Sequence, residues 1–112
     1  MLENCTKSGF MEHKDVEKVK KFLKNLGIKV EHAYLFGSRA KGNALKTSDF
    51  DVIIVSPDYA QVNWFQRITN AYKKWVYAQS LEPLCYTPQE FSKKKNQLGI
   101  VKEAIETGVK IV

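Results

Sequence analysis

The sequence contains little cysteine and lacks any long apolar run. Cys5 and Cys85 are its only cysteines, they lie far apart, and neither belongs to a Cys-x-x-Cys pair. A disulfide framework or a cysteine zinc site is therefore unsupported. No stretch approaches the roughly 18 apolar residues of a membrane-spanning helix, and the first residues have no apolar signal core. These absences predict a cytoplasmic protein that contacts no membrane.

Arginine is also scarce, although the chain is basic. The 18 basic residues exceed the 12 acidic ones, which gives a net charge of +6, but only Arg39 and Arg67 are arginines. Positive charge attracts phosphate-bearing partners, whereas specific recognition of bases and phosphates favours the planar arginine side chain. We therefore expect no sequence-specific nucleic-acid binding, and a small basic nucleic-acid binder is the least supported class.

The remaining composition predicts one globular domain over residues 1–112, in which residues 1–13 form a loose segment. Of the 112 residues, 44% are hydrophobic and 27% are charged. These proportions are ordinary for a soluble domain, and the length allows one core. The chain shows no repeat and no linker rich in glycine, serine or proline.

Apolar spacing predicts four helices and four strands. Phe50–Val55 is almost wholly apolar after Asp51, which predicts a central strand covered on both faces. The order of elements predicts an α/β fold in which a small mixed sheet packs against helices. The helices are expected at 15–26, at 62–79 and, in two pieces, within 88–108, and the other strands at 31–36, 84–86 and 109–112.

Local signals refine the second half of the chain. Pro83 cannot donate to a sheet ladder, so it belongs at the start of its strand or on an edge. Thr87 is the expected N-cap of the next helix, with Pro88 at the first helical position and Glu90 completing a capping box. The 62–79 helix carries apolar residues that are expected on one side, for packing in the core or at an interface: Phe65, Ile68, Tyr72, Trp75 and Val76.

Two aspartates at the start of the central strand predict a metal site. The sequence there is Ser48-Asp49-Phe50-Asp51-Val52. Asp49 and Asp51 are two residues apart in an extended segment, so their carboxylates point to the same face. Two like charges this close are unfavourable unless a cation neutralises them. Hard oxygen ligands suit Mg²⁺ or Mn²⁺.

The preceding strand end predicts a place for a phosphate. The sequence there is Phe36-Gly37-Ser38-Arg39-Ala40-Lys41-Gly42. Gly37 has no side chain, so a phosphate can approach the backbone, and the following amides and the Ser38 hydroxyl can hold its oxygens. The alternative is ordinary turn chemistry, because Gly-Ser and Asp are both common in turns. A phosphate cradle and a metal anchor between two apolar strands together favour the functional interpretation.

These residues resemble the signature of the minimal nucleotidyltransferases, which belong to the DNA polymerase β-like nucleotidyltransferase superfamily. That pattern has Gly-Ser at a strand end, a following Ala and Gly, and then Ser-Asp-x-Asp before an apolar residue, and every element is present here. Tyr86–Phe91 resembles, more weakly, a stretch of archaeal-type members. The resemblance spans the chain from Asp15 onward and implies the polymerase β-like palm fold.

The resemblance also implies a reaction. Such enzymes move a nucleoside monophosphate from a nucleoside triphosphate, here expected to be ATP, to a hydroxyl and release pyrophosphate. By resemblance, Asp49 and Asp51 ligate Mg²⁺ or Mn²⁺, with two metals about 4 Å apart clamping the attacking and leaving oxygens. Gly37 and Ser38 hold the β- and γ-phosphates. The positive net charge then offsets the carboxylates and attracts the triphosphate.

A third carboxylate on a later strand is part of the family pattern, where it binds metal and helps to deprotonate the acceptor. Glu82 is the candidate here, although it replaces a more usual aspartate and Pro83 follows it directly. The alternative for Glu82 is a solvated turn residue. Glu90 is the competing candidate, but its capping role explains it without catalysis.

Three further residues are candidates for binding the triphosphate. Arg39 and Lys41 lie in the turn and can contact phosphate oxygens; the alternative is that both are exposed cations in a polar loop. Ser48 is the third candidate, and it can instead cap the turn that positions Asp49.

The short chain leaves no room for a separate acceptor-binding domain, which points to a partner protein. Minimal members of the family are commonly paired with a helical HEPN-type protein, and some are antitoxins that adenylylate a tyrosine of that toxin. We therefore expect a HEPN-type partner, with a homodimer also plausible. The alternative is a non-catalytic antitoxin or binding module that neutralises its partner by contact, through the edge strand at Pro83 or the aromatic helix.

Overall fold

The computed structural model describes residues 13–41 and 49–112, so the predicted loose N-terminal segment lies almost wholly outside the described residues. Four strands form a mixed sheet in the order β3-β2-β1-β4, in which β2 and β3 are parallel and the other pairs antiparallel. The predicted α/β fold with a mixed sheet is confirmed. The elements are α1 (His13–Asn25), β1 (His32–Phe36), α2 (Ser38–Lys41), β2 (Phe50–Val55), the 3-10 helix η2 (Pro57–Gln61), α3 (Trp64–Lys74), β3 (Leu81–Tyr86), α4 (Pro88–Lys94), α5 (Ile100–Thr107) and β4 (Val109–Lys110).

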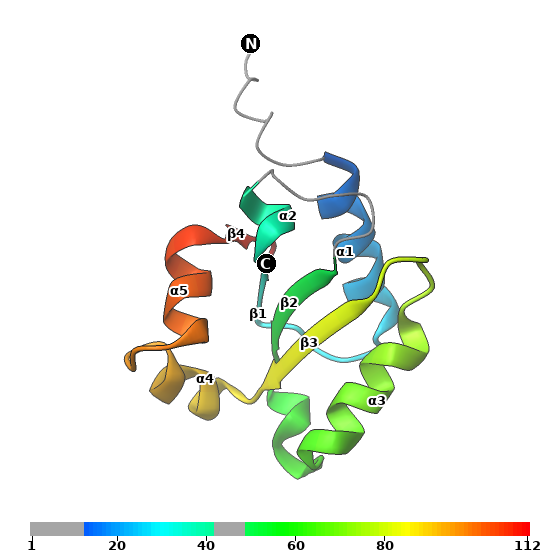
Figure 1. Ribbon diagram of the computed structural model, residues 1–112. Coiled ribbons are helices and arrows are strands. Elements are labelled where there is room, and N and C mark those ends of the chain that lie inside the picture. Colours follow the sequence, from blue (N-terminus) through cyan, green and yellow to red (C-terminus); the bar gives the residue numbers. More distant parts are fainter. Residues whose placement is uncertain (1–12, 42–48) are drawn as a thin grey trace.

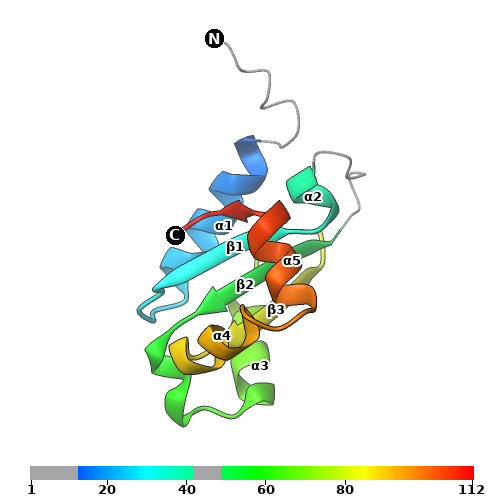
Figure 2. The same cartoon turned by 90° about the vertical axis from the view of Figure 1, so that its left-hand side faces the viewer.

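Helices cover both faces of the sheet. Figure 1 shows α1 and α3 on one side and α4 and α5 on the other, with the strands between them. Figure 2 looks onto the α4/α5 side, where α5 crosses in front of the sheet. Within the described residues, no helix combines the length and the apolar character that crossing a bilayer requires.

The central strand β2 divides its side chains between two apolar clusters. Phe50, Val52 and Ile54 pack with α1 and α3, whereas Ile53 and Val55 pack with α4 and α5. All five are fully buried, as expected for a strand covered on both faces. Successive residues of a strand point to opposite faces, so Asp51 shares the α4/α5 side with Ile53.

The edge strand β3 is longer than predicted. It begins at Leu81 rather than Leu84, and Pro83 lies inside it, opposite Val52. Proline is tolerated there because β3 is an edge strand and pairs on one side only. The edge position of Pro83 was predicted. The three additional residues, 81–83, bring Glu82 into the sheet.

Helix α3 is shorter than predicted, and the side of the helix that faces the core does not carry its large apolar residues Phe65 and Tyr72. Asn63 caps its start by accepting a hydrogen bond from the Gln66 amide at 2.9 Å. The residues of α3 that are buried are Arg67 and Ala71, while Phe65 and Tyr72 are 76% and 51% exposed. The predicted helix over 62–79 was therefore too long, and core packing was wrong for Phe65 and Tyr72, while their packing at an interface stays a prediction.

The predicted capping box starts α4, and one arginine joins it to α3. The Thr87 side chain and the Glu90 side chain each bond the backbone of the other residue. Arg67 donates to Glu90 at 2.7 Å and also to three backbone carbonyls, those of Tyr59, Val62 and Cys85. The Arg67 hydrogen bond is the main reason why the pKa of Glu90 is lowered. Glu90 is therefore accounted for structurally, as the sequence suggested.

Candidate active site

The candidate site lies where β1 ends and β2 begins. Asp51 is paired with Phe36 of β1 on one side and with Glu82 of β3 on the other. Residues opposite each other in neighbouring strands point to the same face. The register therefore places the Glu82 carboxylate beside that of Asp51, on the α4/α5 side of the sheet.

Two of the three predicted carboxylates act on the third, that of Asp51. Burial, followed by the negative charges of Glu82 and Asp49, raises the pKa of Asp51 to about 6. Asp51 is half-buried, whereas Asp49 and Glu82 are exposed. A carboxylate that is shielded from water and faces two like charges is a place where a cation would be favourable.

The carboxylates do not converge on a single point. Among residues 13–41 and 49–112, no three His, Cys, Asp or Glu side chains are grouped closely enough to hold one metal ion. The side chains of Asp49 and Glu82 are exposed, so changes of rotamer can move their carboxylates. The residue types, the shared face and the raised Asp51 pKa fit a hard divalent cation, provided that the two outer side chains rotate inward.

Gly37 makes close contact with Asp51. Gly37 has φ of +77°, a conformation that side chains disfavour. A Cβ atom on this residue would overlap Oδ2 of Asp51. Glycine is thus required here both by the backbone turn and by the nearness of the carboxylate, and the predicted phosphate-binding turn lies directly beside the predicted metal anchor.

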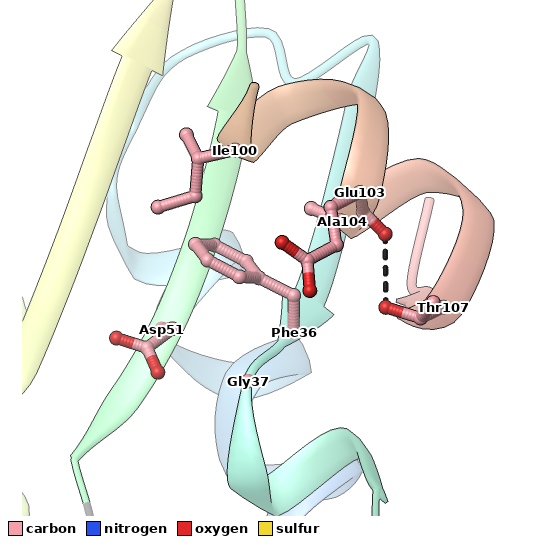
Figure 3. A pocket seen from close by; sticks show the side chains of 7 residues that line it. All are labelled: Phe36, Gly37, Asp51, Ile100, Glu103, Ala104 and Thr107. Atoms are coloured by element: carbon pink, nitrogen blue, oxygen red, sulfur yellow. Dashed lines mark hydrogen bonds between the residues drawn. The ribbon is translucent and has the colours of Figure 1, made fainter. Parts of the chain in front are cut away.

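A cavity of about 250 Å³ opens next to Asp51 and Gly37. Its other walls come from Phe36 at the end of β1 and from α5. Figure 3 shows the Glu103 carboxylate pointing into this space from α5. The complete lining is Phe36, Gly37, Asp51, Ile100, Glu103, Ala104 and Thr107.

Arg39 is inside the fold instead of in an exposed loop. Its side chain is buried and donates to Oδ2 of Asp15 at 3.0 Å. Its guanidinium also lies 4.2 Å from the centre of the Phe50 ring, a cation–π contact. The alternative of an exposed cation was wrong for Arg39, and its binding to a phosphate stays a prediction.

The other candidate residues of the turn are only partly described. Ser38 and Lys41 begin and end the short helix α2, which the sequence did not predict. Ser48, the third of these candidates, lies outside the described residues. Roles for these three residues in triphosphate binding stay predictions.

The α5 wall of the cavity is the part that sequence reasoning missed. Ile100, Glu103 and Thr107 lie more than 60 positions after Gly37 in the sequence, and α5 packs against β1. Glu103 is in the first turn of α5, where acidic residues are common for local reasons. A local pattern therefore could not distinguish it from an ordinary helix residue.

Two comparisons with known proteins identify the family and the fold. Residues 16–111 match the family model for the nucleotidyltransferase domain. The fold is similar to that of a candidate nucleotidyltransferase from Sulfolobus solfataricus, known from a crystal structure, with a TM-score of 0.55 and 21% sequence identity. This match covers 83% of the present chain and 82% of that chain. No curated protein matches the chain in sequence.

Proposed function

This chain belongs to the nucleotidyltransferase domain family and is a transferase, and we propose that it moves the adenylyl group of ATP onto a hydroxyl with the help of Mg²⁺ or Mn²⁺. The observation that carries this proposal is the position of Asp51. It lies between the Gly37 turn and Glu82, and its pKa is raised to about 6. A carboxylate in this situation is suited to bind a cation beside a phosphate.

The three carboxylates and the Gly37 turn have proposed roles in this reaction. Asp49, Asp51 and Glu82 would hold the divalent cation, which when bound stabilises the negative charge that develops on the phosphate oxygens. The Gly37 and Ser38 turn would hold the β- and γ-phosphates. The acceptor oxygen forms a bond to the α-phosphorus, the bond from that phosphorus to the bridging oxygen of the β-phosphate breaks, and pyrophosphate leaves. Glu82 would take the proton of the acceptor hydroxyl.

A transfer assay tests this proposal. The protein is incubated with Mg²⁺, with ATP labelled in the α-phosphate, and with a HEPN-type partner encoded beside its gene, and the label on the partner is measured. Asp51→Asn and Glu82→Gln are each expected to reduce transfer by at least a hundredfold, since each removes a charge that acts on the reacting groups. Glu31→Gln is the matched control, because Glu31 is exposed and precedes β1 at the end remote from Gly37.

The outcome also concerns the nucleotide. We expect ATP to be preferred over GTP, CTP and UTP when the four compete. Undiminished transfer by the combined Asp49→Ala and Asp51→Ala variant would rule out the proposed metal site. Equal use of all four nucleotides would rule out ATP as the specific donor but not the transfer itself.

A second candidate function is neutralisation of a partner protein by contact. The exposed side of α3 favours it: Phe65 and Tyr72 are seven residues apart and therefore lie on one side of the helix, away from the buried Arg67 and Ala71. Helix α3 contains no acidic residue and has Lys73 and Lys74 in its last turn. The surface therefore suits a partner whose apolar surface is bordered by carboxylates.

The two functions separate in one experiment. If contact through α3 neutralises the partner, Phe65→Ser with Tyr72→Ser is expected to abolish protection from the partner, while Asp51→Asn retains it. If transfer neutralises the partner, the Asp51→Asn variant gives no protection even though it still binds the partner. Binding of each variant to the purified partner, measured by calorimetry, shows which effect arises from lost contact.

A further inference from the structure

The cavity beside Asp51 has a second carboxylate, which comes from α5. Figure 3 shows the Glu103 side chain directed into the space that Gly37 and Asp51 border from the sheet. Phe36 also lines that space, and Ala104 is buried on the side of α5 that faces the sheet. Glu103 is thus placed toward the candidate site, even though α5 carries none of the residues that the family pattern contains.

The polar side chains of this cavity accept hydrogen bonds and do not donate them. Asp51 and Glu103 carry carboxylates, and the Thr107 hydroxyl gives its proton to the backbone oxygen of Glu103 at 2.8 Å. The remaining side chains of the lining are apolar. A ligand group that binds at the α5 wall must therefore bring its own donors, and an unaccompanied phosphate there would be repelled by two negative charges.

We propose that Glu103 binds the ribose hydroxyls of the nucleoside triphosphate and so selects ribonucleotides. The two vicinal hydroxyls are the donors that a nucleotide offers close to its phosphates, and a carboxylate can accept from both. The cavity, at about 250 Å³, is below the roughly 300–1,000 Å³ of a site for a complete drug-sized ligand. It therefore suits only the nucleoside end, with the triphosphate at the border that Gly37 forms. The inference rests on the proposed function.

A local structural role for Glu103 gives a different expectation. Glu103 lies in the first turn of α5, where a negative charge stabilises the helix N-terminus slightly. That role affects stability and is indifferent to the sugar of a nucleotide. A metal-binding role for Glu103 would likewise be indifferent to the sugar, so it predicts equally weakened binding of both nucleotides.

Binding measurements without acceptor test the proposal. Calorimetry is carried out in Mg²⁺ with ATP and with 2′,3′-dideoxy-ATP on the wild type, Glu103→Ala and Glu103→Gln. The wild type is expected to bind ATP about tenfold more tightly than the dideoxy analogue, the usual scale for hydrogen bonds to a charged group. Glu103→Ala is expected to lose this preference by weakening only the binding of ATP, and Glu103→Gln to retain part of it. 2′-Deoxy- and 3′-deoxy-ATP then locate the hydroxyl that matters more.

Glu106→Ala is the matched control. Glu106 is exposed on the same helix but does not line the cavity, so this variant is expected to keep the wild-type preference. If Glu103→Ala binds both nucleotides as the wild type does, or binds both more tightly, the proposed contact is overturned while nucleotide binding stands. If the wild type itself binds neither nucleotide, the proposed function fails as well. The comparison of the two nucleotides on the wild type remains valid even if Glu103→Ala folds poorly.

Discussion

The two faces of the sheet differ most at its central strand. On the α1/α3 face, Phe50, Val52 and Ile54 are fully buried among apolar side chains. On the α4/α5 face, Ile53 and Val55 are equally buried, but the first side chain that β2 presents on this face is that of the half-buried Asp51. The strand β2 thus contributes to the core on both faces of the sheet, and it presents a carboxylate at its start on the α4/α5 face.

This difference shows how a small domain can hold charged groups without weakening its core. The period of two along a strand separates neighbouring residues onto different faces, so Asp51 can adjoin Val52 in sequence and yet meet a different environment. The α5 helix covers Phe36 and leaves a cavity next to Asp51. Substitutions at adjacent positions should therefore have opposite consequences.

Val52→Asn should have the largest effect on stability. Its side chain is fully buried on the α1/α3 face, where the amide would have no hydrogen-bond partner in the apolar cluster. We expect the free energy of unfolding to fall by at least about 3 kcal/mol, measured by urea denaturation. Val52→Ala is the control for lost volume and should cost clearly less; equal losses would contradict the view that polarity is what this face excludes.

Arg67→Met should have the next largest effect, because Arg67 connects the two faces at the end of the sheet remote from Asp51. Its removal takes the ion-pair partner from Glu90, which keeps only its hydrogen bond from the Thr87 amide, and takes one donor from each of three backbone carbonyls. We expect a loss of about 3 kcal/mol in the free energy of unfolding. Arg67→Lys should recover only a part, since an ammonium cannot reproduce the planar arrangement of donors. Full recovery by lysine would show that charge alone matters here.

Gly37→Ala should have an intermediate effect and should act through Asp51. The positive φ and the overlap of a Cβ atom with the Asp51 carboxylate together should cost about 2 kcal/mol and abolish transfer. Combining Gly37→Ala with Asp51→Ser removes the overlap and should restore part of the stability but no transfer. If the two substitutions were additive in thermal unfolding, the contact between them would be unimportant.

Asp51→Asn should have the smallest effect on stability, and in the opposite direction to Val52→Asn. The pKa of Asp51 is about 6 in the folded protein, above the ordinary 3.8 of an aspartate. The folded state therefore binds more protons between these values, and wild-type stability falls as pH rises through that window. The amide is neutral and avoids this cost. We expect Asp51→Asn to be more stable by about 1 kcal/mol at pH 7.5 in a chelator, allowing for solvent screening, with the difference shrinking toward pH 4.5.

The same measurement without a chelator extends the comparison to the metal. Added Mg²⁺ should stabilise the wild type at pH 7.5 and progressively less below pH 6, because protons compete for Asp51. Asp51→Asn should respond weakly at either pH. Equal stabilisation of both proteins by Mg²⁺ would contradict binding of the cation at Asp51.

The sequence predicted those elements whose signals are local. The central strand at Phe50–Val55, the capping box at Thr87 and the edge position of Pro83 all follow from neighbouring residues, and all were confirmed. The burial of Arg67 in α3 was missed, because its hydrogen bonds to carbonyls of other elements have no signal in the periodicity of α3. Local hydrophobicity then favoured Phe65 and Tyr72, which are exposed.

In the candidate site too, only the features that depend on neighbouring residues could be predicted from the sequence. The nearness of Asp49 to Asp51 follows from spacing alone, but the position of Glu82 beside Asp51 depends on the register of two parallel strands. The position of Glu103 in the cavity depends on how α5 packs against the sheet, and no local pattern specifies this packing. Arg39 appeared to belong to a polar loop, because its partner Asp15 is 24 residues away.

The short strand β4 has a consequence for how the site is assembled. Val109 and Lys110 pair with Leu35 and Tyr34, directly before Phe36 and Gly37, while β2 pairs with the other side of β1. The Gly37 turn is therefore held by β2 and by a segment more than 50 residues later in the chain. Contacts this distant in sequence form late and slowly in folding. During synthesis β1 would remain an unpaired edge until β4 emerges, so shortening the chain before Val109 should leave a protein prone to aggregation through that edge.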